Sequence, residues 1–159
     1  MKTIKRSSSF LILLCAAPLL ALLVGCASGV KYSEYRPTVA PPADGYGRIW
    51  IYRPSAMGAA VQPAVKLDGQ PVGSAVPHGY FHVEAQPGLH TISTTTEWTH
   101  KTPVTVSTNA DSYVRLNMAM GLFVGHVVPK EVTESMATND MKNLHLAVPQ
   151  PKQSAAAAK

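Results

Sequence analysis

The sequence predicts an all-β chain that folds as a single antiparallel β-sandwich of about seven or eight short strands, with little helix. Runs rich in β-branched and aromatic residues recur between residues 46 and 148. Turn-forming pairs such as Asp-Gly and Pro-Gly separate these runs at intervals of about 8 to 12 residues, which is typical of a sandwich or a barrel. A high density of threonine after residue 90 favours strand over helix there.

The first strand is expected over residues 48–53, where apolar side chains on both faces predict a strand that is buried on both sides or covered by a neighbour. Residues 64–67 form the next strand and lead into Asp68-Gly69, a pair that tolerates positive φ and predicts a tight hairpin turn. Pro71 has no N–H to donate, so the returning strand is expected at the edge of a sheet.

Residues 80–85 alternate between two faces, with Phe81, Val83 and Ala85 on one of them, and this predicts a half-buried strand. Further strands are expected over residues 89–97, 103–107, 113–120 and 122–128, the last of them ended by Pro129. Near the C-terminus, we expect a loop with a short helix in 131–143, started by Thr138, Asn139 and Asp140, a closing strand in 144–148, and a disordered low-complexity tail in 149–159.

The N-terminal segment has the three-part layout of a secretory signal, with basic residues followed by a short apolar run. Lys2, Lys5 and Arg6 supply the charge, and the apolar run extends from Phe10 to Val24. The alternative is a transmembrane helix, which needs roughly 20 apolar residues. This run is shorter and contains a proline, so a cleaved signal is the better interpretation.

The end of this run, Leu23-Val24-Gly25-Cys26, resembles the lipobox of bacterial lipoproteins. The resemblance implies cleavage before Cys26, a thioether-linked diacylglycerol on its sulfur and an acylated amino terminus. The alternative is a chance cysteine after an ordinary signal peptide. In Gram-negative lipoproteins an Asp at the next position retains the protein in the inner membrane. Ala27 therefore implies the periplasmic face of the outer membrane, with the bilayer as partner through acylated Cys26.

These patterns divide the chain into four parts. The signal peptide covers residues 1–25, and the lipidated cysteine with a flexible, proline-containing tether covers 26–45. The β-sandwich domain covers 46–148, and the tail covers 149–159. As an alternative to a free tether, Tyr32 and Tyr35 could dock on the domain.

Charge and cysteine content limit the classes of function. The whole chain has a formal charge of +5, but its three N-terminal basic residues leave with the signal, so the mature chain has 11 Lys and Arg against 9 Asp and Glu. These charges are spread singly, which argues against nucleic-acid binding. Cys15 leaves with the signal and Cys26 takes the lipid, so we expect neither a disulfide nor a free thiol in the domain.

The sequence gives no clear catalytic constellation, and we expect no catalytic residues, cofactor or metal. Neither a nucleophile elbow nor a phosphate-binding loop is present, and the carboxylates are isolated. His78 and His82 would lie about 13 Å apart on one strand, which is too far for a shared zinc. The alternative is that His82, His90 and His126 come together from separate strands and bind a metal.

Aromatic residues give the candidate binding positions. Trp50, Tyr52, Tyr80 and Trp98 could line a face that stacks on sugars, or they could be core and covering aromatics. The stretch from Gly121 to His126 predicts a buried strand with a bulge at Gly125. Its alternative is a partner-binding edge or groove that presents Phe123 and His126.

The order of motifs resembles a family of small bacterial lipoproteins classed as a domain of unknown function. The motifs are Gly47-Arg-Ile-Trp-Ile-Tyr-Arg-Pro54, Val65-Lys-Leu-Asp-Gly69, Pro87-Gly-Leu-His90 and Gly121-Leu-Phe-Val-Gly-His126. The likeness spans about residues 47–148 and implies no activity. Residues 67–90 also resemble PEGA repeats and transthyretin-like sandwiches, which implies a structural or binding module.

Together these observations predict an outer-membrane-anchored periplasmic lipoprotein that is not an enzyme. Its domain is expected to bind or scaffold an envelope protein or peptidoglycan. The alternative is a metal-binding or metal-dependent envelope enzyme that uses clustered histidines.

Overall fold

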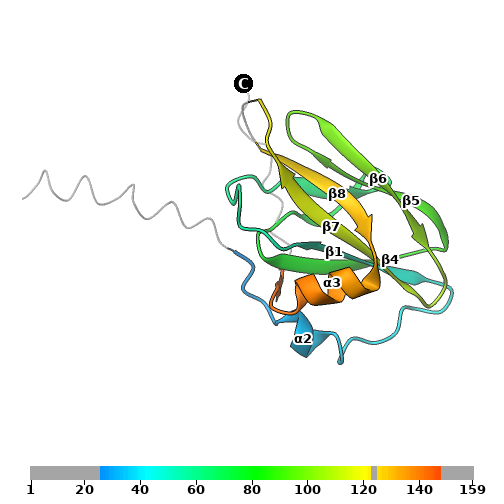
Figure 1. Ribbon diagram of the computed structural model, residues 1–159. Helices are drawn as coiled ribbons and strands as arrows, with labels where there is room; N and C mark the ends of the chain where they lie inside the picture. Colours follow the sequence, from blue (N-terminus) through cyan, green and yellow to red (C-terminus); the bar gives the residue numbers. More distant parts are fainter. Residues whose placement is uncertain (1–25, 123–124, 148–159) are drawn as a thin grey trace, which may run out of the picture.

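A computed structural model describes residues 26–122 and 125–147, which form two stacked sheets with two helices on the outer face of one of them (Figure 1). The strands are β1 Gly47–Arg53, β2 Ala64–Leu67, β3 Gln70–Ser74, β4 Gly79–Ala85, β5 Gly88–Thr95, β6 Thr99–Val106, β7 Asp111–Ala119, β8 His126–Val132 and β9 His145–Leu146. The helices are α2 Tyr32–Tyr35 and α3 Glu134–Met141. The expected signal, residues 1–25, and the expected tail, 149–159, lie outside the described residues, as does Phe123.

The predicted β-sandwich is confirmed. One sheet has five strands in the order β8-β7-β1-β4-β9, and the other has four in the order β3-β2-β5-β6. The five-stranded sheet is mixed, since β1 pairs in parallel with β7 and β4 pairs in parallel with β9. After β1 the chain forms β2 and β3 of the second sheet, returns to the first sheet as β4, forms β5 and β6 of the second sheet, and then returns beside β1 as β7, in the same direction.

All seven residues of β1 are buried, because the strand is covered on both faces. Ile49 and Ile51 point into the core between the sheets. Trp50 and Tyr52 point the other way, into a second core beneath α2 and α3. The prediction that this strand is buried on both sides is therefore confirmed. β4 repeats the pattern, with Phe81, Val83 and Ala85 facing the first core as predicted.

The turn residues and the prolines lie where their backbone chemistry predicts. Asp68 and Gly69 have φ of 49° and 85° and close the predicted hairpin between β2 and β3. Pro71 lies on β3, which is an edge strand as predicted. Pro103 on β6 and Pro129 on β8 also occupy edge strands, where a missing N–H breaks no ladder on the open side.

Three predictions for the C-terminal part are wrong. The strand predicted over residues 122–128, with a buried stretch and a bulge at Gly125, begins only at His126, and Leu122 before it is 75% exposed. Pro129 does not end its strand, because the edge position lets β8 continue from His126 to Val132 with Pro129 opposite Leu116. The helix begins at Glu134 rather than near Thr138, after Thr133 in an extended conformation. Its start is set by packing, since Ala137 and Met141 are buried in the second core.

The prediction of a flexible tether over residues 26–45 is wrong where this segment docks on the sandwich. The alternative, in which Tyr32 and Tyr35 dock on the domain, describes that part. Tyr32 is only 3% exposed and belongs to the second core, with Tyr35 packed against that core. The backbone is tied to β9, as the Gly29 N–H donates to the Leu146 carbonyl and the Leu146 N–H donates to the Val30 carbonyl. Without this segment, the aromatic outer face of β1 and β4 would lose part of its cover.

Candidate functional site

Strand directions bring four loops and Cys26 to one end of the sandwich. β1 ends and β4 begins there, since Arg53 is paired with Gly79. The Ala27 N–H donates to the Pro77 carbonyl at 3.2 Å, so exposed Cys26 lies beside the loop that enters β4. We call this the Cys26 end; it comprises Cys26 and the described loop residues 54–63, 75–78, 96–98, 120–122 and 125.

Arg53 fixes the first of these loops to the sandwich, and sequence patterns did not indicate this role. Its side chain is buried, and its guanidinium donates to four carbonyls at 2.6–2.9 Å: those of Met57, Gly58, Val61 and Ala75. Burial lowers the pKa of Arg53, although a guanidinium stays charged at any physiological pH. The charge is held by carbonyl dipoles, which also define the path of residues 57–61.

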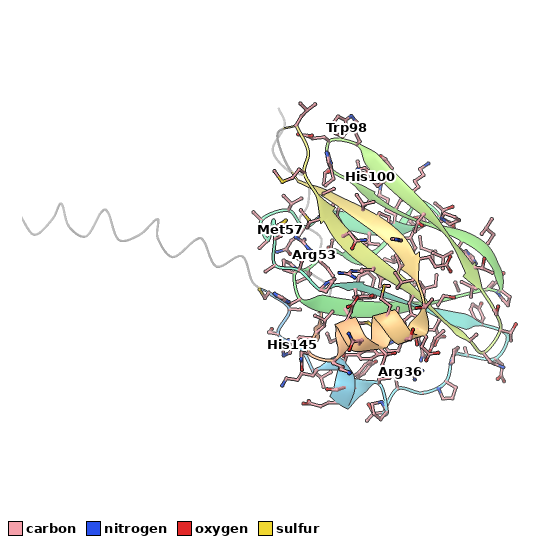
Figure 2. The ribbon with its side chains drawn as sticks, in the orientation of Figure 1. Arg36, Arg53, Met57, Trp98, His100 and His145 are labelled. Atoms are coloured by element: carbon pink, nitrogen blue, oxygen red, sulfur yellow. The ribbon has the colours of Figure 1, made fainter. Side chains whose placement is uncertain are left out.

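His126 lies in a small polar cluster at the tip of the β5–β6 hairpin. Its Nδ1 is 2.7 Å from the Thr96 hydroxyl, and its Nε2 is 3.5 Å from a Glu97 carboxylate oxygen. The Trp98 ring centroid lies 4.7 Å from that of His126, and the His100 centroid lies 5.2 Å from it. His126 is buried, which contradicts the alternative interpretation that it is presented to a partner. Trp98 is half exposed and lies, like His100, near the tip of the β5–β6 hairpin (Figure 2).

The other aromatic candidates are core residues, as the alternative interpretation held. Trp50, Tyr52 and Tyr80 are fully buried, so they cannot line a sugar-stacking face. The Tyr52 hydroxyl donates to Asp140 at 2.9 Å, and the Tyr80 hydroxyl donates to the Val30 carbonyl at 3.0 Å. Burial raises the pKa of both phenols.

Two arginines lie over these aromatics, and their contacts connect the N-terminal segment to the sheet. Arg36 makes an ion pair of 2.5 Å with Asp111, and Arg48 makes one of 3.1 Å with Glu84. Each guanidinium carbon lies 5.7 Å from the centroid of the Trp50 ring, within the range of a cation–π contact. Arg48 also donates to the Ala40 carbonyl at 2.7 Å, which ties the residues after α2 to the sheet.

The three histidines considered as metal ligands lie in separate places. His82 accepts or donates a 3.1 Å hydrogen bond with the Tyr35 hydroxyl, and burial lowers its pKa. His90 is bound to the Asp68 carboxylate at 2.7 Å in the β2–β3 hairpin. His126 belongs to the cluster at the other hairpin. Within the described ranges, no group of three or more His, Cys, Asp or Glu side chains is placed to hold a metal ion.

His90 faces two oxygen acceptors, and these favour the protonated ring. Nδ1 faces Asp68 at 2.7 Å, and Nε2 faces the Gln86 carbonyl at 2.8 Å. Only a doubly protonated ring donates to both, and the bond to Asp68 accordingly raises the pKa of His90. The same bond, with the Thr91 N–H, lowers the pKa of Asp68. The His90–Asp68 pair therefore connects the β2–β3 turn to β5.

Fold and site together define a small two-sheet domain with a docked N-terminal segment. The chain belongs to the family described as "Protein of unknown function (DUF2846)", which matches residues 43–127, from just before β1 to the start of β8. An uncharacterised protein of Haemophilus influenzae is 26% identical over 132 residues, which cover 80% of this chain and 79% of that protein. No solved structure matches the chain. Among residues 26–122 and 125–147, none of the helices has the length and apolar character needed to cross a membrane.

Proposed function

We propose that this protein is a lipoprotein held by acylated Cys26 on the periplasmic face of the outer membrane, where its sandwich serves as a binding or scaffolding module. The observation that carries the proposal is the position of Cys26. It follows the lipobox-like Leu23-Val24-Gly25, it is exposed, and it immediately precedes the segment that docks on β9. A modifying enzyme can reach such a thiol without unfolding the domain.

The lipid would hold the protein firmly. Each buried methylene contributes about 0.8 kcal/mol, so the three acyl chains of a mature lipoprotein keep it on the bilayer where one chain would not. Ala27 at the position after the cysteine supports sorting to the outer membrane. Because the following residues are docked rather than extended, the sandwich would sit close to the headgroups.

A binding role is favoured over catalysis because the polar groups that meet in this structure serve the fold. Arg53 holds loop carbonyls, Tyr52 with Asp140 joins α3 to the sheet, and His90 with Asp68 closes a turn. A protein partner is favoured over a glycan, since Trp50, Tyr52 and Tyr80 are buried, which leaves Trp98 as the exposed aromatic among the four candidates.

Metabolic labelling with a fatty-acid probe tests the proposed lipidation. We expect the full chain and a Cys15→Ser variant to take up label and to fractionate with the outer membrane. Cys26→Ser should lose the label and accumulate as a precursor. Cys15→Ser is the matched control, because it also removes a thiol but lies in the expected signal. Label retained by Cys26→Ser would contradict the proposal.

Cosedimentation with purified cell-wall sacculi tests the glycan alternative. Wild-type protein and Trp98→Ala are compared, because Trp98 is the exposed candidate. No saturable pelleting is expected, and crosslinking in the intact envelope should instead identify a protein partner. Saturable pelleting that Trp98→Ala abolishes while remaining folded would favour the glycan.

A further inference from the structure

Four of the exposed large apolar side chains lie at the Cys26 end. Met57 is 64% exposed, Trp98 51%, Met120 89% and Leu122 75%. They come from three loops that are far apart in the sequence. Figure 2 shows Met57 on the side of the sandwich where residue 26 enters it, and Trp98 above Met57 at the tip of the β5–β6 hairpin. Exposed apolar residues gathered on one surface mark interaction sites, whereas single ones need no explanation.

Side-chain and backbone contacts connect the loops of this surface. Arg53, which pairs with the Gly79 end of β4 beside Cys26, donates to the carbonyls of Met57 and Gly58. A Cβ built on Gly58 would lie 2.5 Å from the Met118 methyl carbon, and one built on Gly125 would lie 2.7 Å from the same atom. The first and last loops therefore meet over Met118.

The hairpin tip joins the same surface through His126. This residue follows Gly125 directly, and its ring is in contact with that of Trp98. The β5–β6 tip is thus adjacent to the β7–β8 loop, which also carries Met120 and Leu122.

Charge separates this end from the opposite one. Among the described residues of the Cys26 end, Glu97 is the one Asp, Glu, Lys or Arg, and its side chain is 20% exposed. The opposite end, where β1 begins and β4 ends, carries Asp44 and three ion pairs, Arg36–Asp111, Arg48–Glu84 and His90–Asp68. Removing charge from water is costly, so an uncharged apolar end enters a lipid interface more readily than a charged end does.

We propose that the Cys26 end is a bilayer-docking surface, on which Met57, Trp98, Met120 and Leu122 enter the lipid interface beside the acyl chains. This rests on the proposed lipidation of Cys26. One residue after the lipid, the Ala27 N–H is bound to the Pro77 carbonyl, so little free chain separates the acyl groups from these loops. Trp is favoured at membrane interfaces, where its ring is apolar and its N–H reaches water. The domain is then oriented, with its charged end pointing away from the membrane.

Tryptophan fluorescence of the purified full chain, reconstituted in vesicles of phosphatidylethanolamine and phosphatidylglycerol, tests this orientation. A share of the lipid has brominated acyl chains, which quench only indoles that reach the acyl region. The chain has two tryptophans, and Trp50 is buried. We expect a blue shift and quenching that disappear in Trp98→Phe, where Trp50 alone remains. Fatty-acid label is measured on the same samples.

Two variants give a matched comparison. The double change Met120→Lys and Leu122→Lys should abolish quenching while label is kept. Leu89→Lys should leave quenching unchanged, since Leu89 is 74% exposed but lies at the opposite end, on the Gly88 side of β5.

Each outcome decides one claim. Labelled protein without quenching of Trp98 overturns the docking surface and leaves the proposed lipidation intact. In another outcome the protein carries the label and shows no quenching in vesicles, while Trp98 is shielded from iodide in native membranes. This result would overturn the bilayer-docking surface and indicate that a protein partner covers Trp98. Unlabelled protein with quenching supports the surface and contradicts lipidation, and unlabelled protein without quenching contradicts both.

Discussion

Tyr32 meets Trp50 edge-on, with ring centroids 5.3 Å apart and an angle of 88° between the ring planes. The same Tyr32 ring is edge-on to Tyr80 at 5.4 Å. A residue six positions after Cys26 thus occupies the centre of the second core. The segment that follows the expected lipid is part of the fold, and under the proposed lipidation it sets how the domain would sit on a membrane.

Tyr32→Ala should remove this central ring and lower the free energy of unfolding by about 3–5 kcal/mol, as large aromatic truncations in cores do. Ser33→Ala is the matched control, because Ser33 is exposed on the same short helix and should change stability by less than about 0.5 kcal/mol. Urea unfolding of the processed chain measures both. Equal stability of the two variants would mean that the segment is not docked in solution.

Gly29→Ala should separate the N-terminal segment from β9. A Cβ at this position would lie 2.4 Å from the Leu146 carbonyl oxygen, which is backbone and cannot rotate away. Overpacking of this kind costs about 1–3 kcal/mol. We expect faster proteolysis near residues 27–35, with Ser28→Ala as the neutral neighbour. Unchanged proteolysis would show that the contact with β9 is loose.

Arg53→Met should destabilise the chain by about 3 kcal/mol or more, because four carbonyls lose a charged donor in a buried site. Amide exchange in residues 55–62 should increase. Arg36→Met removes a partly exposed ion pair instead and should cost less than about 1 kcal/mol. If the two losses were equal, the buried guanidinium would not be holding the loop.

The His90–Asp68 pair should make stability depend on pH within a defined window. The raised pKa of His90 contributes stability that is complete below the ordinary value near 6.5 and is lost as the pH rises through the raised pKa. The lowered pKa of Asp68 contributes stability that is present above its ordinary value near 3.9 and is lost as the pH falls through the lowered pKa.

The contribution should therefore be greatest between about pH 4 and 6.5. Because Asp68 is about half exposed, its size should be below about 1 kcal/mol. The difference in unfolding free energy between wild type and His90→Gln, measured across this range, tests the window. A difference in unfolding free energy that grows above pH 8 would contradict this window, because the contribution of His90 is expected to decrease as the pH rises.

Local pattern was enough to predict most strands. Alternation in β4 and the two apolar faces of β1 are properties of consecutive residues, and Asp68-Gly69 selects its turn by backbone chemistry alone. The parallel pairing of β1 with β7 has no such signature, since it depends on where a distant strand returns.

The candidate site was less predictable, for the same reason. Trp50 and Tyr80 could be named from sequence, but the residues that cover them include Tyr32, in a stretch with little periodic pattern. The role of Arg53 depends on backbone carbonyls that a loop brings to it. Every residue type has such a carbonyl, so the loop sequence does not indicate which carbonyls will meet Arg53. The two arginines of the otherwise apolar, buried strand β1, Arg48 and Arg53, were the one signal that could have pointed to it.

The most direct test is hydrogen exchange of peptides covering residues 27–35 in the lipidated chain, reconstituted in nanodiscs. The docked arrangement predicts slow exchange at Gly29 and Tyr32, whose N–H groups are bound to Leu146 and Leu144, at rates comparable to those of α3. Complete exchange of this segment at the earliest time point would mean a free tether. It would contradict both the docked N-terminal segment and the membrane orientation inferred from it.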